Sequence, residues 1–319
     1  MQTGQWILRR AWAVLLAAAA ACPAFAQRVP FDSGDANFSA EGLVKGVAAD
    51  EAACARVRDA VWARPASGQP ECIRYWAAGL PASGQAARVL VYIPGDQLVF
   101  DEPERGYASR HPRAMQQLAG DMQATLGVPL IVLSRPGTFG SSGEHRQRRR
   151  EHEARLTDAA VDAIKARHGV AEFGLVGLSG GGHLVAALLG WRADVLCAVP
   201  ASSVSSPRLR WQAFGRDRDL TGFADSYEPV DHLRPGVAHS GLRVFVLGDP
   251  KDTNVPWHTQ TPLAERLRAI GVDTQVLTGE GSDGQRHALG GSGRQVGAKC
   301  LQGAPTQDIL DLAAKGLKG

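Results

Sequence analysis

The chain has 319 residues, with 35 basic and 32 acidic side chains and a formal net charge of +3. This near-balance gives no support to a nucleic-acid partner or to binding at an acidic membrane surface, because both favour a clear excess of basic residues. The length is sufficient to bury the core of one α/β domain.

Residues 1–26 have the pattern of a secretory signal peptide. Two arginines precede an apolar run over 11–21, and Ala24-Phe25-Ala26 places small residues where a signal peptidase cleaves. We therefore expect an exported protein, periplasmic or secreted, whose mature chain begins at Gln27. The alternative is a lipoprotein anchored through Cys22. No later stretch approaches the roughly 20 unbroken apolar residues that span a bilayer, so no transmembrane segment is expected.

Four cysteines remain after export, and an even number in an oxidising compartment favours two disulfides. Of the possible pairings we favour Cys54–Cys72, since both residues lie in the N-terminal segment 27–87. Cys197–Cys300 would then join a strand end to the C-terminal region. A metal site is the weaker interpretation because no C-x-x-C or H-x-x-x-H spacing occurs. We expect neither a metal nor a cofactor.

Short apolar strands alternate with longer helices along the chain. The sequence predicts helices over 50–64, 111–126, 151–168 and 262–269, and strands over 73–77, 88–93, 129–133, 175–176, 198–201, 242–247 and 274–277. This alternation is typical of right-handed β-α-β units and a mainly parallel sheet. We expect the main domain to span 88–319, with residues 27–87 packed on it.

A basic run, Arg146-Gln147-Arg148-Arg149-Arg150-Glu151-His152, precedes one of the predicted helices. It could form a basic binding patch. The favoured interpretation is a solvated start of the helix, because acidic residues interrupt the run and no aromatic residues are interleaved with it.

The segment Gly177-Leu178-Ser179-Gly180-Gly181 lies between a short apolar strand and an Ala/Leu-rich helix expected from Leu184 onward. This G-x-S-x-G pattern, in that context, is typical of a nucleophile elbow, since glycines permit a turn too tight for Cβ atoms. The turn would expose the Ser179 hydroxyl above the sheet. The start of the helix would direct free N–H groups toward a developing negative charge.

Residues 202–235 are polar, contain proline and fall between two predicted strands, so we expect a small lid. The aromatic residues of this segment either line a substrate pocket or hold the lid on the body of the domain.

Two further residues follow predicted strands at the edge where parallel sheets bind ligands. Asp252 follows the strand over 242–247 and is the candidate orienting carboxylate. Asp249 competes with it, but Asp249 directly precedes a proline and suits a turn. His287 follows the last predicted strand and is the candidate general base.

The order Ser179, Asp252, His287 resembles the α/β-hydrolase superfamily over nearly the whole mature chain. Residues 177–181 match its elbow, and Gly248-x-x-Asp252-x-x-Val255-Pro256 is similar to the segment that carries its acid. Residues 135–142 resemble its R-P-G-x-G-x-S segment with one added residue. Residues 227–233 are similar to the S-P-x-x-x-L segment of members related to prolyl oligopeptidase, with Glu228 at the serine position.

The resemblance implies an α/β-hydrolase fold and a triad in which His287 takes the proton of Ser179 while Asp252 holds the imidazole. It also implies an oxyanion hole formed by the backbone N–H groups of Gly180 and Asp96. The family usually has His-Gly where this chain has Pro94-Gly95-Asp96. A carboxylate there would oppose an oxyanion unless it turns away.

The sequence therefore predicts an exported serine hydrolase that cleaves a carboxylic ester through an acyl-enzyme. One alternative is a serine peptidase that acts on short peptides. Another is a catalytically silent binding protein on the same fold, since fold alone does not settle function. The expected partner is a small-molecule ester or a short peptide.

Overall fold

The computed structural model describes residues 28–32, 34 and 38–319. The predicted signal peptide and the lipoprotein alternative at Cys22 lie outside the described residues. No helix within the described ranges is long and apolar enough to cross a membrane.

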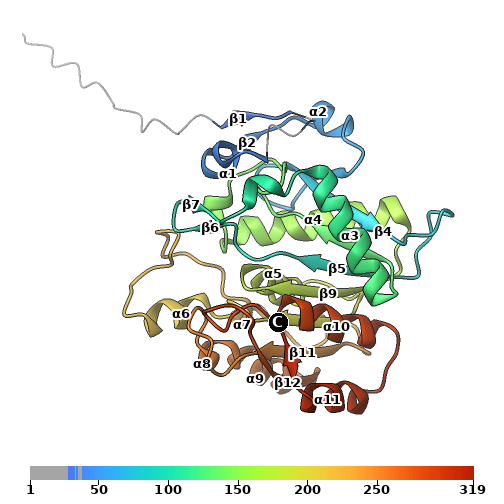
Figure 1. The fold of residues 1–319 in the computed structure, drawn as a ribbon, viewed down its shortest axis with the longest axis vertical. Helices are drawn as coiled ribbons and strands as arrows, with labels where there is room; N and C mark the ends of the chain where they lie inside the picture. The colour runs from blue at the N-terminus through green and yellow to red at the C-terminus, as the bar shows by residue number, and fades with distance from the viewer. Residues whose placement is uncertain (1–27, 33, 35–37) are drawn as a thin grey trace, which may run out of the picture.

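A mostly parallel sheet forms the centre of the molecule, and helices cover both of its faces (Figure 1). The strand order is β13-β12-β11-β10-β9-β5-β8-β4-β3. These strands are β3 (Ala60–Ala63), β4 (Glu71–Ala78), β5 (Arg88–Ile93), β8 (Leu130–Leu133), β9 (Glu172–Leu178), β10 (Val195–Ala201), β11 (Arg243–Gly248), β12 (Asp273–Glu280) and β13 (Leu317–Lys318). The pairings β4–β8 and β3–β4 are antiparallel and the others are parallel.

The continuous apolar strands are explained by burial on both faces. On β5, Val89, Val91 and Ile93 pack into one core cluster, whereas Leu90 and Tyr92 pack into the other. The first cluster is covered by α4 (Glu151–His168), α5 (Gly180–Leu188) and α9 (Pro262–Ala269). The second is covered by α3 (Pro112–Leu126), α10 (Gly290–Leu301) and α11 (Thr306–Ala314).

Shorter elements decorate this framework. They are β1 (Val29–Pro30), α1 (Ala40–Lys45), β2 (Val47–Ala48), α2 (Glu51–Ala55), β6 (Leu98–Val99), β7 (Glu102–Pro103), the 3-10 turns Tyr107–Ser109 and His145–Gln147, α6 (Pro207–Ala213), α7 (Pro229–His232) and α8 (Trp257–Gln260). In Figure 1, α6 and the β6–β7 hairpin lie at the same side of the sheet.

The predicted helix over 50–64 is wrong beyond its first part. The helix α2 ends at Ala55, and β3 follows and pairs antiparallel with β4. The pairing buries Val61 and Ala63 in the core. Burial and a ladder of backbone hydrogen bonds outweigh the weak helical preference of this segment.

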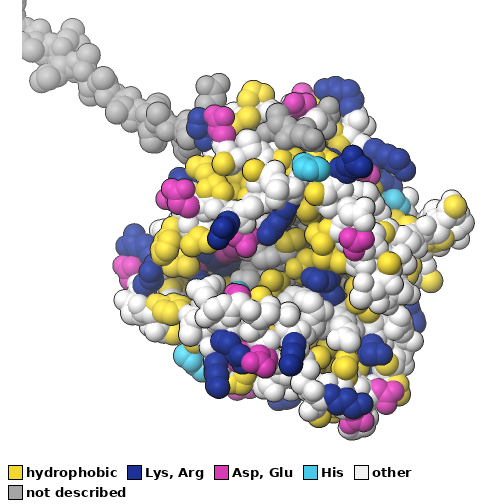
Figure 2. All heavy atoms as spheres, in the orientation of Figure 1, with side chains coloured by type: hydrophobic (Ala, Val, Ile, Leu, Met, Phe, Trp, Pro, Cys, Tyr) yellow, Lys and Arg dark blue, Asp and Glu magenta, His cyan; other side chains and the backbone are white. Residues whose placement is uncertain are grey.

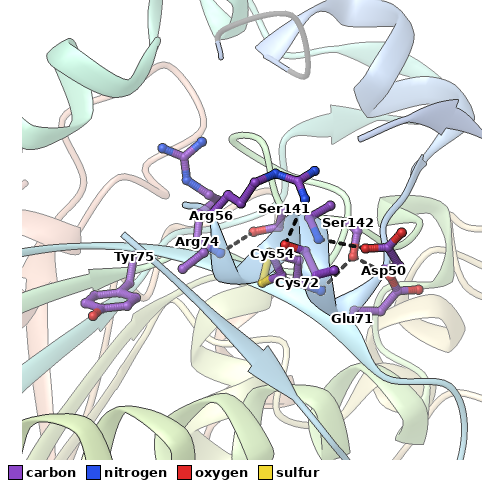
Figure 3. The surroundings of a disulfide bond; sticks show 12 residues. Asp50, Cys54, Arg56, Glu71, Cys72, Arg74, Tyr75, Ser141 and Ser142 are labelled. Atoms are coloured by element: carbon purple, nitrogen blue, oxygen red, sulfur yellow. Dashed lines mark hydrogen bonds between the residues drawn. A yellow bond between two sulfur atoms is a disulfide. The ribbon is translucent and has the colours of Figure 1, made fainter. Parts of the chain in front are cut away.

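Both predicted disulfides are confirmed in the structure. Cys54–Cys72 joins α2 to β4, and Cys197–Cys300 joins β10 to α10. Around the first bridge, Figure 3 shows the loop that carries Ser141 and Ser142 lying against β4. The Cys72 N–H donates to Ser142 Oγ at 2.7 Å. This loop therefore supplies hydrogen-bond acceptors to the strand that holds the disulfide.

Candidate active site

Ser179 lies in a strained turn between β9 and α5. Its φ of 55° and ψ of −117° fall in a region that non-glycine residues rarely adopt. A Cβ on Gly177 would lie 2.2 Å from the Gly181 carbonyl oxygen, and one on Gly181 would lie 2.1 Å from the Ile93 oxygen. Only glycine fits at either position. The helix begins at Gly180 rather than at Leu184, so its first N–H groups lie next to the serine.

His287 and Asp252 are joined by a hydrogen bond of 2.7 Å between Nδ1 and Oδ2. The second oxygen of Asp252 accepts the backbone N–H groups of Asn254 at 2.8 Å and of Val255 at 2.9 Å. Among the described residues, His287 Nε2 is buried and has no hydrogen-bond partner. One side of the imidazole is therefore held, and the other is available to a proton donor.

Asp249 is engaged elsewhere. Its Oδ1 accepts the Lys251 N–H at 2.8 Å, and its Oδ2 accepts the Gly281 N–H at 3.0 Å and Arg286 Nε at 2.8 Å. These bonds lower the pKa of Asp249 although burial opposes them. Asp249 thus ties the loop after β11 to the loop after β12.

A cavity of about 500 Å³ contains Ser179 and His287 in its wall, together with Gly95 and Asp96; we refer to it as the Ser179 cavity. Figure 2 shows a hollow on this face, bordered by apolar and basic side chains. The apolar part of the wall includes Leu98, Val99, Met115, Leu118, Met122 and Phe139. A larger cavity of about 640 Å³ near Tyr75 and His168 contains none of the predicted catalytic residues.

The Asp96 side chain is bound by three guanidinium groups. Its Oδ1 lies 2.8 Å from Arg135 Nη1, and its Oδ2 contacts Arg148 Nε at 3.1 Å and also Arg149 Nη1. Burial would raise the pKa of Asp96, but Arg149, Arg135 and Arg148 hold it well below the usual range. The carboxylate is thus ionised and its charge is offset.

The basic run is therefore not a wholly solvated start of a helix, and that interpretation is wrong for two of its residues. Arg148 is 2% exposed and Arg149 is 0% exposed. Arg149 also forms an ion pair with the buried Asp219, with Nη2 2.5 Å from Oδ1. From the sequence alone, a run of charged residues is expected to face solvent. Arg148 and Arg149 are buried because carboxylates far away along the chain lie next to them in the fold. The aspartates at 96 and 219 carried no local signal for this pairing.

Part of the 202–235 segment reaches the Ser179 cavity. Val204, Arg210 and Leu220 lie in the wall, whereas the four aromatic residues of the segment do not: Trp211, Phe214, Phe223 and Tyr227. Sequence reasoning did not identify Arg210 as a residue of the site. An arginine on a short polar helix has no distinguishing local pattern.

Comparison by sequence matches no family model and no curated protein. The structure is similar to prolyl oligopeptidase B from Galerina marginata, with a TM-score of 0.52 and 15% identity over 77% of this chain and 36% of that one. Acylaminoacyl peptidase gives 0.51 and 12% identity over 76% and 40%. Est1E from Butyrivibrio proteoclasticus, determined with ferulic acid, gives 0.50 and 12% identity over 80% and 99%.

These proteins share a fold with the chain at identities too low to carry an activity across. The chain has the α/β-hydrolase fold, as the sequence resemblance implied. It spans well under half the length of the two peptidases and nearly the full length of the esterase.

Proposed function

We propose that the protein is a serine hydrolase that cleaves a carboxylic ester, with Ser179 as nucleophile, His287 as general base and Asp252 as orienting acid. The observation that carries the proposal is the 2.7 Å bond from His287 to Asp252, which leaves a buried Nε2 without a partner. Ser179, on its strained turn, lines the same cavity as this imidazole.

The first half-reaction forms an acyl-enzyme. Ser179 Oγ attacks the ester carbonyl while its proton moves to His287 Nε2, and Asp252 stabilises the imidazolium. The tetrahedral intermediate collapses, the C–O bond to the alcohol breaks, and the alcohol leaves with the proton from Nε2. Water then attacks the acyl group by the same route and releases the acid and Ser179.

The backbone N–H groups of Gly180 and Asp96 are proposed to hold the oxyanion. Gly180 is the first residue of α5, where N–H groups lack partners within the helix. A backbone donor works whatever its side chain, and the Asp96 carboxylate is bound by Arg135, Arg148 and Arg149. These guanidinium groups offset the repulsion that the departure from His-Gly would otherwise create.

We further propose that the protein is exported. The two disulfides are compatible with an oxidising compartment, as is the N-terminal sequence pattern. Microsequencing of the mature N-terminus tests cleavage before Gln27 against cleavage before a lipidated Cys22.

The test of function has two stages. Purified wild type and Ser179→Ala are treated with a fluorophosphonate probe, which labels only an activated serine; we expect labelling of the wild type alone. A panel of p-nitrophenyl esters is then compared with aminoacyl p-nitroanilides. Faster ester turnover supports the esterase, faster anilide turnover identifies the peptidase, and an unlabelled, inactive wild type identifies the binding protein.

A further inference from the structure

Arg210 places a guanidinium group in the wall of the Ser179 cavity. It belongs to α6 and is only 7% exposed. Its Nε donates to the backbone oxygen of Asn254 at 2.9 Å, and its Nη2 donates to Asn254 Oδ1 at 2.6 Å. Both acceptors are neutral. Within the described ranges, no carboxylate lies at ion-pair distance from Arg210, so its charge has no direct counter-ion.

The buried charges nearby do not supply one. They form a network of three guanidinium and three carboxylate groups that pair with one another, in which only Asp96 is partly exposed: Arg135, Arg148, Arg149, Asp96, Glu153 and Asp219. The remaining buried carboxylate at the site, Asp252, is held by His287 and by two backbone N–H groups. Asp96, Asp219 and Asp252 attract the charge of Arg210 only from beyond ion-pair distance, and none of them contacts its guanidinium group.

Burial makes such a charge costly. Burial, and then the nearby charge of Arg149, lower the pKa of Arg210 to about 10, so the guanidinium remains charged near neutral pH. A purely structural role would be to hold Asn254, whose side chain also donates to Gln285 Oε1 at 3.0 Å. A neutral amide donor could do the same, and the Phe214 ring, with its centroid 5.8 Å from Cζ, carries no formal negative charge, so neither contact supplies a counter-ion. A ligand with the opposite charge does.

We propose that the substrate carries a carboxylate in addition to its scissile ester, and that Arg210 binds that carboxylate. This inference rests on the proposed function and adds the class of substrate. With Nε and one Nη2 hydrogen bound to Asn254, the Nη1 group remains to donate to a ligand oxygen. A single positive charge without a direct ion-pair partner matches a monoanion better than a phosphate, which carries nearly two negative charges at neutral pH.

The acidic residues in the cavity wall do not oppose such a ligand strongly. Asp96 is bound by arginines, and Glu104 accepts Arg110 Nη1 at 3.4 Å. One oxygen of Asp283 accepts the backbone N–H groups of His287 at 2.6 Å and of Ala288 at 3.1 Å. The apolar part of the wall would contact the remainder of the substrate.

The test compares isosteric esters that differ only in charge. On the acyl side, mono-p-nitrophenyl glutarate is paired with the p-nitrophenyl ester of glutaramic acid. On the alcohol side, 4-acetoxybenzoate is paired with 4-acetoxybenzamide. In one of the two pairs, we expect wild-type kcat/KM to favour the carboxylate by about 10- to 100-fold, the effect of a charge-assisted hydrogen bond. A phosphonate analogue of the favoured ester completes the series.

Variants assign the preference to Arg210. Arg210→Gln should abolish it, while Arg210→Lys should retain part of it. The matched control is Arg208→Gln on the same helix, since the Arg208 side chain is exposed and pairs with Asp231; its anion preference should equal that of the wild type. The ratio of the two rates is compared, so a general loss of activity in a variant cancels.

Three results would overturn the proposal: no anion preference in either pair for the wild type, a preference that persists in Arg210→Gln, or a stronger preference for the phosphonate. If Arg210→Gln does not fold, an undiminished preference in Arg210→Lys counts against it. Failure of the proposed function differs, because no ester would turn over and Ser179 would not be labelled. Calorimetric titration of Ser179→Ala with monomethyl glutarate, a monoanion, and with the neutral methyl ester of glutaramic acid then decides the inference: selective binding of the monoanion supports it, and equal or absent binding overturns it.

Discussion

Asp252 Oδ2 lies 2.7 Å from His287 Nδ1, although the two residues belong to loops that follow different strands, β11 and β12. The strands are parallel neighbours, so their carboxyl ends lie at the same edge of the sheet. Two backbone N–H groups fix the other oxygen of Asp252. The backbone of its own loop thus holds the Asp252 carboxylate in the orientation in which it bonds the imidazole.

Asp252→Asn should reduce kcat far more than Asp249→Asn. An amide at position 252 can favour the wrong imidazole tautomer, and the expected loss is about ten thousandfold. Asp249 bonds Gly281 and Arg286 instead, so its variant should chiefly lose stability. Kinetics of both variants with one p-nitrophenyl ester check this. The opposite order of the two losses would assign the acid to Asp249.

Ser179→Ala should lower turnover on the order of a millionfold without unfolding the protein. The substitution removes one hydroxyl oxygen and leaves the turn between β9 and α5 with its glycines. Turnover is measured beside circular dichroism and fluorophosphonate labelling. A folded variant with activity within tenfold of the wild type would exclude Ser179 as the nucleophile.

Arg149→Met should cost much more stability than Arg150→Met, the same substitution one residue further on. Removal of Arg149 leaves the buried Asp219 without its ion-pair partner and takes one of three guanidinium groups from Asp96, for an expected loss of about 3 to 5 kcal/mol. Arg150 pairs with the exposed Asp225, and its loss should cost less than about 1 kcal/mol. Urea denaturation measures both. Equal losses would contradict the buried ion pair between Arg149 and Asp219.

His183→Gln should reduce the acid sensitivity of the fold. Burial lowers the pKa of His183 from 6.5 to about 4, and Nε2 lies 2.9 Å from the Tyr227 backbone oxygen. Above pH 6.5 neither state binds the proton. As the pH falls below 6.5, the unfolded chain binds it and the folded chain does not, so the free energy of unfolding falls until about pH 4.

The contribution of His183 to that decline is about 3 kcal/mol, and glutamine, which does not titrate but keeps an N–H donor, should remove it. Urea denaturation of the wild type and the variant between pH 7 and pH 4 gives the difference. Parallel pH profiles for the two proteins would be inconsistent with a neutral, buried His183.

Loss of the disulfides should lower stability more than catalysis. The sequence separations of the two bridged pairs are 18 and 103. In the chain-entropy estimate, loops of these lengths stabilise the folded state by about 3 and about 4.7 kcal/mol. Paired substitutions, Cys54→Ala with Cys72→Ala and Cys197→Ala with Cys300→Ala, are compared by melting temperature and by ester turnover at room temperature. A folded variant with lost turnover and an unchanged melting temperature would contradict this expectation.

Much of the fold could be predicted because its signals are local. Arg88–Ile93, Glu151–His168 and Pro262–Ala269 have the predicted bounds, since each combines a clear hydrophobic period with a distinct start and stop. The segment over 50–64 failed because its strand exists only by pairing with β4. A pattern read along the chain does not contain that partner.

The sequence by itself determined most of the strand and helix succession and the turn at Ser179, because these depend on side-chain size, glycine and short-range order. It favoured the two cysteine pairs, but only the fold brings Cys197 and Cys300 together across 103 residues of sequence separation. Only the tertiary structure decided between Asp249 and Asp252 as the neighbour of His287, since both follow the same strand. It also decided the environment of Asp96, which depends on charges 39 to 53 residues away. Buried charge is stabilised by whichever opposite charge the fold brings near, and a linear sequence does not specify that distance.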